Sequence, residues 1–261
     1  NGHISAATNT ALEMAQYAYA VLMDQDDALT PDALRVVAEA ISEHPDGLLF
    51  YSDEDKIHDD GFIFYPYFKN GRWDWDLLYG QNFVSHLGVY RTDRMRQIGG
   101  FREGFRGSQD FDMLLRYTAG AEAAQFVHIP RVLYHWRAHA GSTALDVGVK
   151  SEAVDSACRA VQEHLVTFSP GAEAEILPGS QFLRVKFPLP EKRPLVSLIC
   201  AADNIAFLHE QLSAIMSRTT YGKYEVFFLI SQTLAKDELV KVQRAVNSHK
   251  NVHLVICEAH L

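Results

Sequence analysis

The sequence predicts an α/β fold in which helices alternate with the strands of a parallel sheet. Apolar residues recur at helical spacing in several segments, and short apolar runs of strand length separate these segments. Such alternation favours parallel strands, because a helix carries the chain back between them. Two acidic clusters follow apolar runs directly. Ligands of parallel sheets bind beyond the carboxyl ends of the strands, so these clusters are candidates for a site.

The first four elements are expected to be a helix, a strand, a second helix and a second strand. Ser5 suits the N-cap of the first helix, and residues 19–23 form a short apolar strand. Pro31 suits the first position of the second helix, which Pro45 ends. Residues 47–51 are expected to form the second strand.

The middle of the chain is less regular and is rich in aromatic residues from position 57 to 106. A helix is expected to begin at Ser108 and to stop at Gly120. Residues 126–135 predict a strand with an internal proline, and residues 150–165 predict a helix. We therefore expect the first domain to reach residue 165.

A linker and a second domain are expected to follow. Residues 166–193 contain four of the nine prolines, which indicates an irregular connection. Residues 194–261 carry a βαβαβ pattern. Neither GxGxxG nor GxxxxGK[ST] occurs, so the pattern indicates neither a dinucleotide fold nor a P-loop.

Composition excludes several classes of protein. The formal charge of −9 argues against non-specific nucleic-acid binding, which needs a basic face. No apolar run approaches the roughly 18 residues that span a bilayer. The three cysteines form no CxxC, so a reducing compartment is expected. The chain begins at Asn1 and stops soon after a strand, so we expect a piece of a longer protein.

The acidic clusters suggest metal chemistry. Residues two apart in an extended segment point to the same side, so Asp24 and Asp26 can face one divalent cation. The second cluster, residues 53–55, could line the same cleft. For both clusters the alternative is a solvated acidic turn after a strand.

Further candidates lie beyond these clusters. Asp110 stands at a helix start, where the dipole favours the ionised form that a general base requires, or it is a simple helix-start acid. His135 could ligate Mn²⁺ or serve a structural role. Arg137 could bind a phosphate or pair with an acidic cluster. The aromatic stretch 62–75 predicts either core or a platform for sugar rings.

Together, six motifs in this order resemble family 2 glycosyltransferases of the GT-A fold, over residues 1 to about 165. The motifs are Asn1–Ala7, Leu22–Asp27, Tyr51–Lys56, Gly99–Arg102, Gly107–Asp112 and His128–Arg137. The resemblance is strongest to bacterial transferases of O-antigen and rhamnose-polymer type, which often carry tandem domains. It implies that residues 1–165 are the C-terminal part of one such domain and residues 194–261 the N-terminal part of a second.

The resemblance implies a metal-dependent, inverting transferase for cell-surface polysaccharide synthesis. A sugar would move from a nucleotide-diphosphate donor to a hydroxyl of a glycan or lipid-linked glycan. The resemblance assigns Asp110 as catalytic base, and Asp24, Asp26 and His135 as ligands of Mn²⁺ or Mg²⁺. We further expect donor contacts from Asp27, Asp53, Glu54, Asp55 and Arg137, and acceptor contacts from Trp73 and Gln109.

The cellular location and two alternative functions are also expected from the sequence. We expect a cytoplasmic protein without a nucleic-acid partner, and we leave peripheral association with the inner face of the membrane open. Residues 230–233 lack the acid that relatives carry after the second strand, which argues against nucleotide binding by the second domain. The resemblance also implies that the first domain lacks its first strands and the second its DxD half, so the isolated chain is expected to be folded in part and inactive alone. The rival hypotheses are a metal-dependent phosphohydrolase and a non-catalytic glycan-binding or scaffold module.

Overall fold

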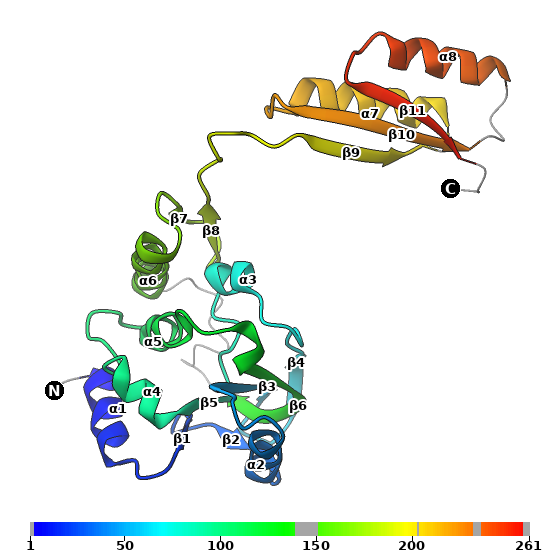
Figure 1. The fold of residues 1–261 in the computed structure, drawn as a ribbon. Helices are drawn as coiled ribbons and strands as arrows, with labels where there is room; N and C mark the ends of the chain where they lie inside the picture. Colours follow the sequence, from blue (N-terminus) through cyan, green and yellow to red (C-terminus); the bar gives the residue numbers. More distant parts are fainter. Residues whose placement is uncertain (1–2, 139–150, 203, 232–235, 258–261) are drawn as a thin grey trace. The chain divides into compact units, whose positions relative to one another are not determined.

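The chain divides into two compact units, Asn1–Pro188 and Leu189–Leu261. The computed structural model describes residues 3–138, 151–202, 204–231 and 236–257 (Figure 1). Positions 150 and 234, where two of the expected helices begin, lie outside these ranges. Each unit is described separately below.

The first unit is built on a mixed sheet. Its order is β1-β5-β3-β6-β2, and β4 pairs with the free end of β3. Among the described strands of this sheet, β3 and β6 form the one parallel pair, and the other pairs are antiparallel. The strands are β1 (Tyr19–Leu22), β2 (Ala28–Leu29), β3 (Leu49–Ile57), β4 (Ile63–Tyr67), β5 (Gly88–Arg91) and β6 (Phe126–Arg137).

The α/β class is confirmed, but the expected all-parallel sheet is wrong for this unit. β5 lies between β1 and β3 and runs opposite to both. It comes from the irregular aromatic stretch, in which the sequence pattern resolves no strand. The helices of the unit are α1 (His3–Met14), α2 (Ala33–Glu43), α3 (Trp75–Gly80), α4 (Thr92–Gln97), α5 (Gln109–Thr118) and α6 (Ser151–Phe168), with a 3₁₀ turn at Ala123–Gln125.

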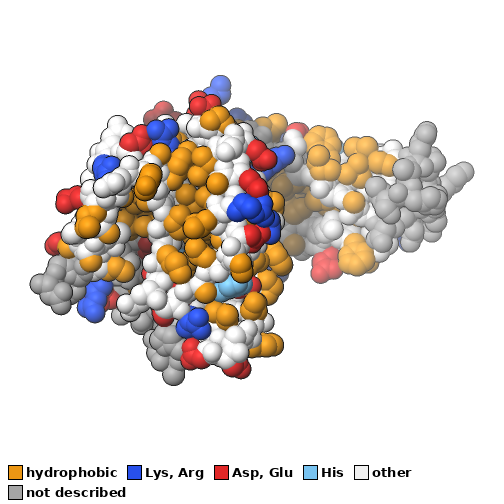
Figure 2. All heavy atoms as spheres, turned by 90° about the horizontal axis from the view of Figure 1, so that it is seen from below, with side chains coloured by type: hydrophobic (Ala, Val, Ile, Leu, Met, Phe, Trp, Pro, Cys, Tyr) orange, Lys and Arg blue, Asp and Glu red, His pale blue; other side chains and the backbone are white. Residues whose placement is uncertain are grey.

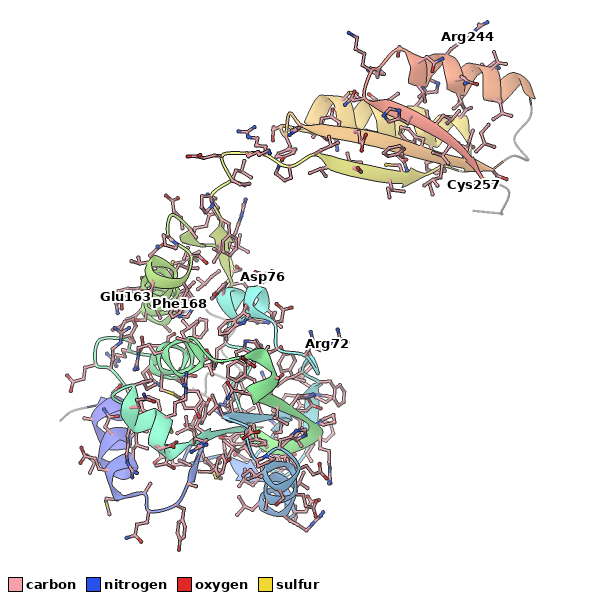
Figure 3. The ribbon with its side chains drawn as sticks, in the orientation of Figure 1. Arg72, Asp76, Glu163, Phe168, Arg244 and Cys257 are labelled. Atoms are coloured by element: carbon pink, nitrogen blue, oxygen red, sulfur yellow. The ribbon has the colours of Figure 1, made fainter. Side chains whose placement is uncertain are left out.

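Most of the segment expected as a linker, 166–193, belongs to the first unit, which ends at Pro188. It holds the end of α6 and an antiparallel hairpin of β7 (Glu173–Ile176) and β8 (Leu183–Lys186). β7 contacts α6, and β8 contacts α3. Figure 3 marks Glu163 and Phe168 on α6 and Asp76 on α3. The hairpin buries Leu183, which explains why the compact unit reaches beyond residue 165.

Aromatic side chains fill the core on the α5–α6 side of the sheet. Trp73 packs against Phe126 and Phe83, with ring centroids 4.3 and 5.2 Å apart. Its indole Nε1 is buried without a hydrogen-bond partner among the described residues. Trp73 is therefore partly buried and packs against the core of the unit, and its expected contact with the acceptor stays a prediction.

The loop before α5 anchors α1. The Asn9 side chain donates to Phe101 O and accepts from Phe101 N, both at 2.8 Å. Gly100 has φ +64, and a Cβ there would lie 2.3 Å from Asn9 Oδ1, so the loop requires glycine. Ser5 lies inside α1 and donates to Arg102 O at 3.1 Å, so it does not cap the helix as expected.

A buried carboxylate fixes the start of α5. Asp112 is 1% exposed and accepts hydrogen bonds from Arg102 and Arg116. Arg102 also pairs with Glu163 of α6 at 2.8 Å. Because the Asp112 carboxylate is buried and bound by both guanidinium groups, it holds the first turn of α5 in place. This is the turn that carries Asp110.

The second unit matches the expected βαβαβ pattern. Its strands β9 (Val196–Ala201), β10 (Tyr224–Ser231) and β11 (Val252–Cys257) are parallel in the order β11-β10-β9. The helices α7 (Ile205–Arg218) and α8 (Lys236–Asn247) pack on one face of the sheet, where the buried core includes Leu208, Leu212, Val226, Phe228, Ile230 and Val242. Figure 1 shows both helices on the same side of this small sheet.

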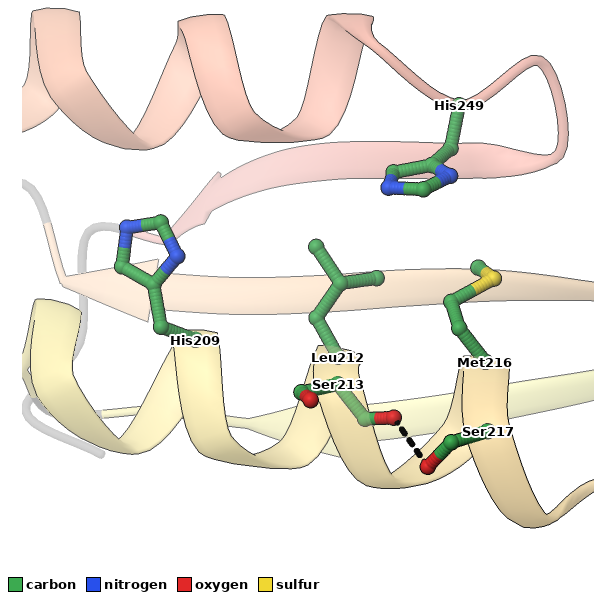
Figure 4. Close-up of a pocket in the computed structure, with 6 residues that line it drawn as sticks. All are labelled: His209, Leu212, Ser213, Met216, Ser217 and His249. Atoms are coloured by element: carbon green, nitrogen blue, oxygen red, sulfur yellow. Dashed lines mark hydrogen bonds between the residues drawn. The ribbon is translucent and has the colours of Figure 1, made fainter.

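A cavity of about 410 Å³ lies on the helical side of the second unit (Figure 4). Ser217 Oγ donates to Ser213 O at 2.7 Å along its wall. The residues that line it are His209, Leu212, Ser213, Met216, Ser217 and His249. They include no carboxylate, so the cavity offers no acid for metal or proton chemistry.

Hydrophobic side chains also gather on one face of the molecule. Figure 2 shows them as a band with acidic and basic side chains beside it. Across the described ranges, no helix has both the length and the apolar character that crossing a bilayer requires.

Candidate active site

An acidic turn follows β1 and is tied to β6. Asp27 is 8% exposed, and its carboxylate accepts from the Tyr134 hydroxyl and, at 2.7 Å, from Arg137 N. The Asp24 N–H donates to the same Tyr134 hydroxyl at 3.2 Å. The Asp24 side chain is exposed. Tyr134 therefore fixes the turn so that Asp24 stands at its open side.

His86 brings an imidazole to this turn. Asp24, Asp27 and His86 each offer one possible ligand atom, and these atoms lie within 4.8 Å of one another. The His86 ring stacks on Tyr134 with centroids 4.5 Å apart and planes at 9°. Two carboxylates and one imidazole fit a divalent transition metal. Asp26 and His135, the ligands expected beside Asp24, are not part of this group of three.

Asp110 lies in the first turn of α5, close enough to Asp24 for their charges to interact. Asn82 Nδ2 donates to Asp110 Oδ2 at 2.9 Å. Burial raises the pKa of Asp110. The backbone N–H groups of the helix start, His86 and Asn82 lower this pKa, but their effect is smaller than that of burial. The helix start does favour the charged form, as the sequence indicated, but desolvation outweighs it.

The same site raises the pKa of Asp24. Asp24 is exposed to solvent, but the protein around it still desolvates the carboxyl in part, and this is the largest cause of the raised pKa. The negative charges of Asp27, Asp26 and Asp110 raise the pKa further, while His86 opposes them. Asp24, Asp27 and Asp110 thus surround the His86 imidazole, and Asp26 adds negative charge beside Asp24. Such mutual repulsion is relieved by a bound cation, which is the electrostatic property expected of a metal site.

The two residues before Asp110 have local partners. Ser108 occupies the N-cap position, but its hydroxyl donates to Ala153 O at 2.8 Å instead of capping the helix. Gln109 Oε1 accepts from Gly107 N at 3.0 Å. Gln109 therefore shapes the loop that leads into α5, which leaves its expected contact with the acceptor a prediction.

The second acidic cluster lies inside β3 and not beyond its end. Asp53, Glu54 and Asp55 are 4, 7 and 6% exposed. β3 runs to Ile57, because its second half pairs with β4 on one side and β6 on the other. The expectation that these acids close the strand and line the donor cleft is therefore not supported, because their side chains are buried among protein donors.

Each of the three acids has a protein partner. Asp53 Oδ1 accepts from Lys69 N at 2.8 Å and hydrogen-bonds with His128 Nε2 at 2.8 Å. Asp55 Oδ1 lies 2.5 Å from His135 Nδ1. His135 is thus engaged with β3 and is not a member of the Asp24, Asp27 and His86 group. Expected as a metal ligand, it acts in this geometry as a link between β6 and β3.

Lys69 connects the buried acids to His86. Its ammonium is fully buried and contacts Glu54 Oε2 at 3.1 Å, Val84 O at 2.6 Å, and His86 O. Glu54 Oε2 also accepts from His86 N at 2.8 Å. Burial lowers the pKa of Lys69, and Glu54 partly restores it. The Lys69–Glu54 pair therefore fixes the backbone of residues 84–86, which places His86 next to the acidic turn.

Arg137 extends the site toward solvent. Its Nε donates to Asp26 O at 2.5 Å, and its Nη1 lies 3.8 Å from Asp59. Arg137 pairs with the acidic turn, as one of the two sequence-based interpretations had it. A contact of Arg137 with a donor phosphate remains a prediction.

Sequence reasoning missed three residues that shape the site: His86, Asn82 and Lys69. No motif distinguishes His86 among the twelve histidines. Asn82 and Lys69 lie in the irregular stretch, and their roles depend on partners brought near by folding. One available signal was that Lys69 directly follows a run of aromatic residues, where burial of the ammonium requires a buried acid.

Residues 1–98 match the sequence profile described as "Glycosyl transferase family 2". The chain is 40% identical over 98% of its length to "Uncharacterized protein y4gI" of Sinorhizobium fredii. It is 31% identical over 91% of its length to "O-antigen biosynthesis protein RfbC" of Myxococcus xanthus. It spans 28% and 18% of the lengths of these two relatives.

The comparison with solved structures finds that of S. aureus TarS 1–349 in complex with UDP-GlcNAc. The TM-score is 0.49 at 16% identity, over 63% of this chain and 47% of that chain.

The buried pair should dominate the stability of the site. We expect Lys69→Met to lower the free energy of unfolding by about 3–5 kcal/mol, because Glu54 then keeps a buried charge without its cation. Adding Glu54→Gln should recover part of that loss. Urea denaturation of the single and double variants measures both effects.

Lys186→Met is the matched control. Lys186 pairs with Glu175 at the surface, with half of its side chain exposed. Its removal should cost less than about 1 kcal/mol. Equal losses for Lys69→Met and Lys186→Met would contradict the assignment of Lys69 as an anchor.

Proposed function

We propose that the first unit, which belongs to glycosyl transferase family 2, transfers a sugar from a nucleotide-diphosphate donor to a hydroxyl of a glycan. One observation carries the proposal. A group of two carboxylates and one imidazole lies beside a half-buried carboxyl at the start of α5. The first three residues suit a cation that binds a diphosphate, and the last suits a general base.

Asp24, Asp27 and His86 would hold the cation. An imidazole nitrogen among the ligands favours Mn²⁺ over Mg²⁺, which prefers oxygen ligands alone. Asp26 adds negative charge beside Asp24 and so increases the attraction for a cation. When bound, the cation supplies positive charge next to the leaving diphosphate.

Asp110 takes the proton of the acceptor hydroxyl. The hydroxyl oxygen attacks the anomeric carbon as its proton passes to the carboxylate, and the nucleotide diphosphate leaves from the opposite side with inversion. The raised pKa makes Asp110 a stronger base than an ordinary aspartate. Asn82 orients the carboxylate through its bond to Oδ2.

The acceptor belongs to the same proposal. The relative from Myxococcus xanthus is described as an O-antigen biosynthesis protein. By analogy, we assign the acceptor to a growing cell-surface polysaccharide, free or lipid-linked. The place of action would be the cytoplasm, at the inner face of the membrane, where nucleotide-activated donors are made.

The metal site has a direct test. We expect isothermal titration of the chain with Mn²⁺ to give at least tenfold weaker binding for His86→Ala than for the wild type, because one of three ligands is lost. His135→Ala is the matched control and should change the affinity less than threefold. The reverse order of the two variants would place the ligand at His135 and contradict the Asp24–Asp27–His86 assignment.

The base has a second test, in the full-length protein with a panel of nucleotide-diphosphate sugars and a glycan acceptor. We expect Asp110→Asn to lower turnover about 10²–10⁴-fold, as loss of a general base does. Donor affinity should stay within about threefold, or roughly 0.6 kcal/mol. The melting temperature should stay equal or rise, because the variant removes a charge that burial disfavours.

Two results would contradict this function. Near-normal turnover of Asp110→Asn with a lower melting temperature would make Asp110 a structural residue. Release of phosphate or nucleotide at an equal rate with and without the acceptor would favour the phosphohydrolase.

A further inference from the structure

We propose that the hairpin of residues 58–68, here called the aromatic hairpin, binds the pyranose rings of the glycan acceptor. It joins β3 to β4 and exposes apolar side chains within seven positions. The exposed fractions are 62% for Phe62, 48% for Ile63, 76% for Tyr65, 38% for Tyr67 and 70% for Phe68. The inference rests on the proposed function, because it names the surface for the acceptor of that reaction.

The exposed apolar side chains of the aromatic hairpin indicate a surface that binds a ligand. Exposed apolar groups that lie together, and not scattered singly, mark binding surfaces in soluble proteins. The first unit does bury other aromatic residues, such as Phe83 and Phe126, in its core, and Trp73 packs against them. The hairpin therefore differs from the rest of the aromatic stretch in what its rings contact.

The rings of the hairpin form a continuous row. The centroids of His58 and Phe64 lie 4.2 Å apart, and those of Phe62 and Phe64 lie 6.2 Å apart, with planes within 18° of parallel. Tyr65 meets Phe64 edge-on at 5.4 Å. A row of rings presents several apolar surfaces in sequence, which matches the repeating CH faces of a sugar chain.

Tyr65 is held in an unfavourable backbone conformation. Its φ is +46, in the left-handed region that residues other than glycine rarely adopt. The register between β3 and β4 shifts at this point, between Glu54 and Lys56. Strain of this kind concentrates at binding sites. Here it keeps the most exposed ring of the hairpin next to Phe64.

Charge favours a glycan over a membrane as the partner. The tip of the hairpin carries Asp59 and Asp60, and the Asp59 side chain is 73% exposed. An anionic bilayer repels these carboxylates. Sugar hydroxyls, in contrast, donate hydrogen bonds to carboxylates while their CH faces pack on rings. The combination of rings and acids therefore fits a carbohydrate.

The aromatic hairpin is continuous with the candidate active site. Lys56 pairs in register with Phe64, and its ammonium lies 5.2 Å from the centroid of the Trp136 ring. The Trp136 ring lies 5.7 Å from that of His86. On the other side, Arg137 joins Asp27 to Asp59. A glycan on the hairpin can therefore extend toward the residues that hold its reacting end.

The test measures binding without turnover. The chain is applied to an array of pyranose oligosaccharides of four to eight units, and the strongest binder is titrated by saturation-transfer NMR. We expect Tyr65→Asn and Phe68→Ser each to weaken that binding at least tenfold, or 1.4 kcal/mol. Asparagine tolerates the left-handed backbone at position 65, so Tyr65→Asn removes the ring and keeps the fold.

Tyr17→Ser is the matched control, because Tyr17 is 84% exposed and lies outside the hairpin. It should leave the glycan affinity unchanged. Binding to no oligosaccharide of the array, or equal affinity in the Tyr65 and Tyr17 variants, would overturn the proposal. So would binding to phosphatidylglycerol vesicles that Tyr65→Asn abolishes, since the hairpin would then be a membrane contact.

The two proposals fail separately. Asp110→Asn should bind the oligosaccharide as the wild type does, because Asp110 lies in α5 and not on the hairpin. If the hairpin variants bind normally while Asp110→Asn loses turnover, the transferase function stands and the acceptor surface lies elsewhere. If Asp110→Asn transfers normally while the hairpin variants lose binding, the assigned base is wrong and the glycan surface stands.

Discussion

The candidate site depends on one buried ammonium group. Lys69 Nζ bridges Glu54 of β3 and the carbonyl oxygens of Val84 and His86, and Glu54 also accepts from His86 N. A buried charge requires a partner, so the protein keeps this pair together or pays a large desolvation penalty. The loop before β5 is fixed as a result, and His86 stacks on Tyr134 beside the acidic turn. Lys69 thus fixes the backbone of His86, and Tyr134 fixes its ring by stacking.

The sequence predicts the parts of the site that follow regular elements. Asp24 comes directly after a short apolar strand, and Asp110 stands in the first turn of a helix with a clear start and stop. In the structure the charges of both interact. The helices of the second unit are recovered for the same reason, because their apolar stripes are long enough to show a period. In these elements the local pattern and the fold agree.

The sequence pattern does not predict features that depend on contacts between residues far apart in the chain. β4, α3, β5 and α4 are each at most six residues long, too short for a clear period, and β5 is placed by pairing with β1 and β3. Asp53 and Glu54 were interpreted as the end of a strand, but Lys69 and His128 allow them to be buried within it. Within the aromatic stretch, composition alone did not separate Trp73, which packs against the core, from the exposed rings of the aromatic hairpin. Burial of an acid or a ring is a property of the contacts that the fold supplies.

The position of a bound Mn²⁺ ion tests the assigned metal site most directly. Crystals of the chain grown with MnCl₂ and a nucleoside diphosphate would be measured at the manganese absorption edge. If Asp24 and His86 are ligands, we expect an anomalous peak within coordination distance, about 2.0–2.3 Å, of the Asp24 carboxylate and the His86 imidazole. A peak between Asp55 and His135, or no peak near the acidic turn, would contradict it.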